Sequence, residues 1–128
     1  MSVVVAYLAT AEGDAALARA IEAAREKSWP LTVVLSRYRD PSDPGDERAK
    51  DAAAARSRLD EAGVEYVVRE SAVGVDPGND VISVATELGA GLVVIGLARR
   101  SPTGKLNLGI GAQIVLLESP CPVLVTHP

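Results

Sequence analysis

Strand-like and helix-like segments alternate along the 128-residue chain, which predicts an α/β fold: a three-layer sandwich with a parallel sheet between two helical layers. Three observations support this prediction. Five short runs rich in Val, Ile and Leu are separated by four longer segments whose apolar residues recur at helical spacing. The first two of these runs are almost entirely apolar, as in strands buried on both faces. Since no linker or repeat interrupts the pattern, we expect one domain over residues 1–128.

The first strand is expected at Val3–Leu8, a continuous apolar run, and the second at Leu31–Leu35, which is apolar except for Thr32, because both runs are rich in β-branched residues. Between them, apolar residues recur every three or four positions, which predicts a helix that Thr10 or Asp14 caps. The buried face of this helix would consist of Leu17, Ala20, Ile21 and Ala24.

The second helix is expected over Glu47–Ala62, after a turn-rich loop at residues 40–46. Asp46 would cap its N-terminus, and Gly63 follows its last residue, where glycine commonly ends a helix. The next run, Val64–Val68, alternates apolar and polar residues more than the first two strands do. This alternation predicts a strand near the edge of the sheet.

The C-terminal part of the chain continues the alternation. A turn at Asp76–Asn79 would lead into a third helix that ends at Gly89, and Gly91–Ile95 is a strongly apolar strand. A fourth helix is expected over Leu106–Leu117, which is apolar nearly all round. Two prolines then force a break before a short final strand at Val123–Val125.

Composition excludes several classes of function. The net charge is -4, and only four residues are aromatic, so a nucleic-acid partner is disfavoured. The single cysteine, Cys121, and the single histidine, His127, exclude an internal disulfide and a cluster of thiol or imidazole metal ligands. Because the single histidine is the penultimate residue, a Ser/His/Asp triad is also disfavoured. We therefore expect no metal site and a binding module rather than a metabolic enzyme.

The start of the chain lacks a basic leader followed by a long apolar core, and the longest apolar stretch, around Ala90–Ala98, is too short to span a bilayer. We therefore expect a cytoplasmic protein with no membrane partner.

Ligands of parallel α/β sheets bind beyond the carboxyl ends of the strands, which directs attention to residues 8–13 and 96–109. The second loop is rich in glycine and basic residues, and no acidic residue occurs between Leu88 and Leu117. Glycine lets backbone N–H groups approach an anion, and a following helix N-terminus adds a favourable dipole. A solvated loop whose glycines serve only turns is the alternative. The candidate phosphate-binding residues are Gly96, Arg99, Arg100, Gly104, Lys105, Gly109, Ile110 and Gly111.

The chain resembles the universal stress proteins over nearly its whole length, most clearly at Gly89–Gly96 and Ser119–Val125. The resemblance implies a five-stranded parallel sheet in the order 3-2-1-4-5 with four helices, similar to the adenine-nucleotide alpha-hydrolase fold. It also implies a homodimer in which the last strand, here Val123, Leu124 and Val125, pairs across a two-fold axis.

ATP-binding members of that family carry Gly, two residues, Gly, nine residues, then Gly followed by Ser or Thr. Here Gly96 and Gly109 match the first and third glycines, whereas Arg99 replaces the second and Ile110 replaces the hydroxyl residue. Those members also carry an Asp near the adenine and ribose, and Leu8 stands at that position. The candidate adenine and ribose side of the site therefore consists of Ala6, Tyr7 and Leu8.

These departures favour a stress-response homodimer that acts through protein contacts, with a degenerate nucleotide pocket and no required cofactor. The alternative is an ATP- or AMP-binding switch in which Arg99, Arg100 and Lys105 supply positive charge to the phosphates. Absence of any small ligand also remains open at this point.

Overall fold

The computed structural model describes residues 1–8, 10–35, 46–70, 77–100, 105–106 and 110–128. Within them, five parallel strands form one sheet in the order β3-β2-β1-β4-β7. Because β7 is the fifth strand of this sheet along the chain, the predicted order 3-2-1-4-5 is confirmed. The strands are β1 (Val3–Tyr7), β2 (Leu31–Leu35), β3 (Tyr66–Glu70), β4 (Leu92–Gly96) and β7 (Val123–Thr126).

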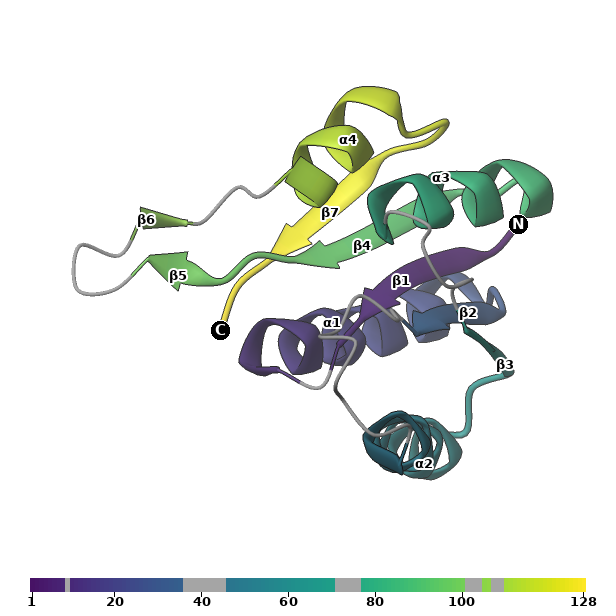
Figure 1. Cartoon of the computed structure of the whole chain (residues 1–128). Coiled ribbons are helices and arrows are strands. Elements are labelled where there is room, and N and C mark those ends of the chain that lie inside the picture. The colour runs from purple at the N-terminus through teal and green to yellow at the C-terminus, as the bar shows by residue number, and fades with distance from the viewer. Residues whose placement is uncertain (9, 36–45, 71–76, 101–104, 107–109) are drawn as a thin grey trace.

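Four helices in the described residues cover the two faces of the sheet, as Figure 1 shows. One face carries α1 (Ala11–Lys27) and α2 (Asp46–Ala62), and the other carries α3 (Pro77–Leu88) and α4 (Ile110–Glu118). The predicted three-layer arrangement is therefore confirmed.

Strand β1 lies in the middle of the sheet and contributes to both cores. Val3, Val5 and Tyr7 pack against the side of α1 and α2, whereas Val4 and Ala6 pack against the side of α3 and α4. Alternate residues of a strand point to opposite faces, so a strand covered on both faces is apolar along most of its length. This requirement explains the continuous apolar run from which the strand was predicted.

The start of α1 is fixed by Thr10, whose hydroxyl oxygen accepts a hydrogen bond from the Gly13 amide over 3.1 Å. Of the two predicted caps, Thr10 is therefore the one that caps the helix. Gly13 is required here because a Cβ atom at this position would lie 1.8 Å from the carbonyl oxygen of Leu8. The first turn of α1 thus lies directly against the chain that leaves β1.

Several predicted boundaries need correction. Strand β3 pairs with β2 from Tyr66 to Glu70 instead of starting at Val64, although its place at the sheet edge is as predicted. Asp46 is the first residue of α2, not the cap before it, and Pro77 begins α3, so most of the predicted turn at 76–79 is helical. Proline suits a first helical position, because the N–H that it lacks would have no partner there.

The predicted fourth helix also starts later than expected. Lys105–Leu106 form strand β6, which pairs antiparallel with β5 (Arg99–Arg100), and the helix begins only at Ile110. The apolar composition of 106–117 suggested one continuous helix, but the backbone of 105–106 bonds across to another segment. The helix is also less covered than its composition suggests, since Leu117 is 84% exposed.

None of the helices in the described residues is both long enough and apolar enough to cross a membrane.

Candidate functional site

A pocket of about 210 Å³ opens at the carboxyl ends of the adjacent parallel strands β1 and β4. The next strand of the sheet after β1 is β2, on one side of this pair, and the next after β4 is β7, on the other side. This is the position where parallel α/β sheets usually bind ligands. Its lining residues in the described part of the chain are Ala6, Tyr7, Leu8, Thr10, Glu12, Gly78, Val81, Ile95, Gly96, Gly111, Ala112 and Val115.

The interior of the pocket is apolar and lies on the side of the sheet covered by α3 and α4. Ala6 and Ile95 come from the two strands, and Val81 and Val115 come from the two helices. All four residues belong to, or pack against, the core on that side. A surface of this kind suits a flat apolar group such as an aromatic ring.

Three helix N-termini reach the pocket, because every helix that follows a parallel strand starts at the carboxyl edge of the sheet. Helix N-termini attract anions. The first turn of α1 already contains Glu12 and Asp14, and that of α3 contains Asp80, whereas the first turn of α4 contains no acidic residue. The start of α4, at Gly111, is therefore the most favourable place for an anionic group of a ligand.

Two glycines of the pocket have different roles. At Gly96 a Cβ atom would lie 2.1 Å from the carbonyl oxygen of Glu12, so glycine is required for α1 to cross the end of β4. At Gly111 a Cβ atom would meet only the amide nitrogen of Gly78, at 3.7 Å, which is an ordinary contact. Gly96 therefore serves packing, whereas Gly111 leaves space and an accessible backbone at the start of α4.

Tyr7 supports the pocket from the opposite side of the sheet. Its hydroxyl donates a hydrogen bond to Asp14 over 3.1 Å, and Asp14 also accepts one from Arg58 of α2 over 3.2 Å. Burial raises the pKa of Tyr7 to about 12, and the negative charge of Asp14 adds to this effect. The hydroxyl is thus committed to α1 and α2 and is not directed to a ligand.

The structure brings together five residues that the sequence assigned to the site from two distant segments. Leu8 lines the pocket at the position where the family resemblance implies a carboxylate. Residues 99–100 and 105–106 form the β5–β6 hairpin beyond the carboxyl end of β4 (Figure 1), and Ile110 begins α4. Gly104 and Gly109 lie outside the described residues. The five assembled residues are Ala6, Tyr7, Leu8, Gly96 and Gly111.

The sequence did not single out Thr10, Glu12 or Gly78 as site residues. Thr10 and Glu12 lie in the loop and helix start that follow β1, so the position of that loop was the available signal. Gly78 comes from the start of α3, which no motif marked. No group of three or more potential metal ligands lies together in the described residues.

Comparisons with known proteins agree with this architecture. The model of the Universal stress protein family matches residues 1–127. A universal stress protein of Mycolicibacterium smegmatis is 35% identical over 127 residues, which cover 98% of this chain and 97% of the relative.

Two solved structures are similar to this chain along its length. The universal stress protein from Archaeoglobus fulgidus has 28% sequence identity and a TM-score of 0.78, with 98% of this chain and 97% of the other covered. A structure of the universal stress protein from Archaeoglobus fulgidus in complex with dAMP has 27% identity and a TM-score of 0.74, with 98% and 96% covered.

Proposed function

The chain belongs to the universal stress protein family, and from that premise we propose that this stress-response protein binds an adenine mononucleotide in the pocket between β1 and β4. The observation that carries the proposal is that Ala6 and Leu8 from one end of the chain meet Gly96 and Gly111 from the other around an open pocket.

The adenine ring and the phosphate of a mononucleotide each have a matching part of the pocket. The apolar interior between Val81 and Val115 suits the adenine ring, and the start of α4 at Gly111 suits the phosphate. The volume of about 210 Å³ is small beside the roughly 300–1,000 Å³ of many ligand pockets, which favours a mononucleotide over a larger ligand. The similar Archaeoglobus fulgidus structure that contains dAMP supports this size of ligand.

We expect the affinity to be modest, because Leu8 cannot supply the anionic hydrogen-bond acceptor that the family resemblance implies at this position. We also propose that the nucleotide is sensed rather than turned over and that no cofactor is required for folding. The Thr10 hydroxyl, the obvious nucleophile of the pocket, already accepts the hydrogen bond that caps α1. A cytoplasmic location is also part of the proposal.

Thermal unfolding with AMP, dAMP and ATP tests the proposal. A ligand present at ten times its Kd raises the midpoint by about 5 °C for a domain of this size. We expect AMP and dAMP to produce such a shift, and its absence at millimolar concentrations would contradict the proposal. The variant Ala112→Leu, which fills the pocket, should lose the shift. Ala54→Leu, the same change at an exposed position of α2, should keep it.

A second function, self-association, is favoured by one separate observation. β7 is the last strand of the sheet, and among the described residues no strand pairs with its outer side. A free edge of this kind is a site for pairing with another chain. We propose that two copies pair through Val123, Leu124 and Val125, so that light scattering should give a mass of twice 13.3 kDa.

A further inference from the structure

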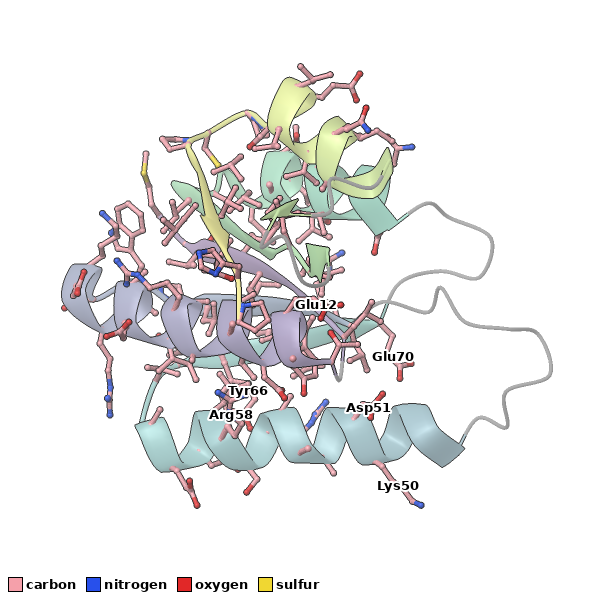
Figure 2. All side chains as sticks on the ribbon, turned by 90° about the vertical axis from the view of Figure 1, so that its left-hand side faces the viewer. Glu12, Lys50, Asp51, Arg58, Tyr66 and Glu70 are labelled. Atoms are coloured by element: carbon pink, nitrogen blue, oxygen red, sulfur yellow. The ribbon has the colours of Figure 1, made fainter. Side chains whose placement is uncertain are left out.

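Glu12 is the one carboxylate among the residues that line the pocket in the described part of the chain. It lies in the first turn of α1 and is half-buried. Its position is well defined, because the Thr10 cap fixes this turn and the Glu12 backbone packs closely against Gly96. Figure 2 shows Glu12 at the N-terminal end of α1.

The two acidic residues of this turn face different surroundings. Asp14 is engaged by Tyr7 and Arg58 on the side of α1 and α2. Glu12, in contrast, forms no side-chain hydrogen bond or ion pair within the described residues. Its negative charge is therefore available to act on whatever occupies the pocket.

A charge at this position must act on the whole ligand. The pocket volume of about 210 Å³ corresponds to a width of roughly 6 Å, which is shorter than the Debye length of about 8 Å at physiological ionic strength. Partial burial of the site weakens solvent screening further. Each additional phosphate on a ligand therefore adds negative charge that Glu12 repels, while an uncharged or singly phosphorylated ligand is penalised less.

We infer that Glu12 is a specificity-determining residue, which makes the pocket prefer nucleosides and nucleoside monophosphates to di- and triphosphates. This inference rests on the proposed function and adds the charge of the ligand to it. A repulsive element of this kind selects between ligands that share the same base and sugar. It acts at the start of α1, whereas the favourable position for an anion lies at the start of α4.

Isothermal titration of the full-length protein with adenosine, AMP and ATP tests the inference. The buffer contains a metal chelator, so that no divalent cation neutralises the phosphates. The wild type should bind AMP about tenfold more tightly than ATP, given the interaction of charges at such distances. In Glu12→Gln this ratio should fall about five- to tenfold, with little change for adenosine. Glu12→Asp keeps the charge and should retain most of the preference.

Glu26→Gln is the matched control, because it makes the same change at an exposed position near the other end of α1. It should leave the AMP-to-ATP ratio as in the wild type. A wild type that prefers ATP, or an unchanged ratio in Glu12→Gln, overturns the inference but leaves nucleotide binding intact. Failure of the wild type to bind any of the three ligands overturns the proposed function, and this inference with it.

Discussion

The hydroxyl of Tyr7 lies 3.1 Å from Oδ1 of Asp14, and the same carboxylate oxygen lies 3.2 Å from Nη1 of Arg58. These two hydrogen bonds connect the end of β1, the start of α1 and the middle of α2. The connection matters for α2, because Ala55 and Leu59 are its only fully buried apolar side chains in the described residues. Figure 2 shows Arg58 and Tyr66 between α2 and the rest of the molecule.

Tyr7 should make stability depend on pH in the alkaline range. Its pKa is raised from 10.0 to about 12 in the folded protein, mainly by burial. Below pH 10 the phenol is neutral in both the folded and the unfolded chain, so Tyr7 makes its full contribution to the free energy of unfolding. Between about pH 10 and 12 only the unfolded chain ionises readily, so stability falls as pH rises, by about 1–2 kcal/mol. Urea unfolding of the wild type and of Tyr7→Phe should show a shallower decline in the variant.

Tyr66→Phe is the control for this experiment. The pKa of Tyr66 is also raised, by its hydrogen bond to Asp60, but the residue lies near the surface. Removal of its hydroxyl should therefore leave most of the alkaline decline in place. Equal slopes for the wild type and Tyr7→Phe would show that the Tyr7 phenol is not the group responsible.

Arg58→Ala should loosen α2 more than it destabilises the whole fold. The Arg58–Asp14 pair is partly exposed, with side-chain exposures of 37% and 55%, so its loss should lower the free energy of unfolding by about 0.5 kcal/mol. Amide hydrogen exchange should nevertheless become faster along α2. Arg56→Ala, at an exposed position of the same helix, should leave the exchange rates of α2 unchanged. Equal exchange rates of the α2 amides in the wild type and in Arg58→Ala would argue against a role of the Arg58–Asp14 pair in holding α2.

The glycines around the pocket should respond differently to alanine. Gly13→Ala and Gly96→Ala place a Cβ atom 1.8 Å and 2.1 Å from backbone oxygens, which forces α1 away from the ends of β1 and β4. We expect each to destabilise the fold by at least about 2 kcal/mol. Gly111→Ala meets only a 3.7 Å contact in the first turn of α4 and should be neutral or stabilising by up to about 1 kcal/mol. Chemical denaturation of the three variants measures the contrast, and similar losses in all three would refute it.

The sheet could be predicted from the sequence because burial on both faces leaves a strong pattern. Val3–Tyr7 is apolar without interruption and Leu31–Leu35 is apolar except for Thr32, and the structure places both strands in the interior of the sheet. The β5–β6 hairpin could not be predicted in this way. Its segments, 99–100 and 105–106, are two residues long, and pairing between such short segments leaves no periodicity to detect.

The pocket was predictable only in part, for a similar reason. Parallel topology places the loops after β1 and β4 at one edge, and this brought Leu8, Gly96 and Gly111 into the prediction. The contribution of Gly78 depends on how α3 packs against α4, which sequence spacing does not specify. The role of Glu12 depends on how closely the first turn of α1 approaches Gly96. Both are properties of packing between elements rather than of either element alone.

Val125→Pro should separate dimerisation from folding. The carbonyl oxygen of Pro122 accepts a hydrogen bond from Val93 of β4 over 3.0 Å, and that of Thr126 accepts one from Leu97, directly after β4, over 2.8 Å. Since alternate residues of a strand direct their backbone groups to opposite sides, Val125 directs its N–H away from β4, toward the free edge. Proline at this position removes an edge donor and leaves the bonds to β4 intact. Light scattering should then give 13.3 kDa for this variant and twice that mass for the wild type.

Val125→Ala is the control, because it shortens the side chain but keeps the backbone N–H, so this variant should stay dimeric. A dimeric Val125→Pro would show that the β7 edge is not the interface, and a monomeric wild type would reject self-association itself.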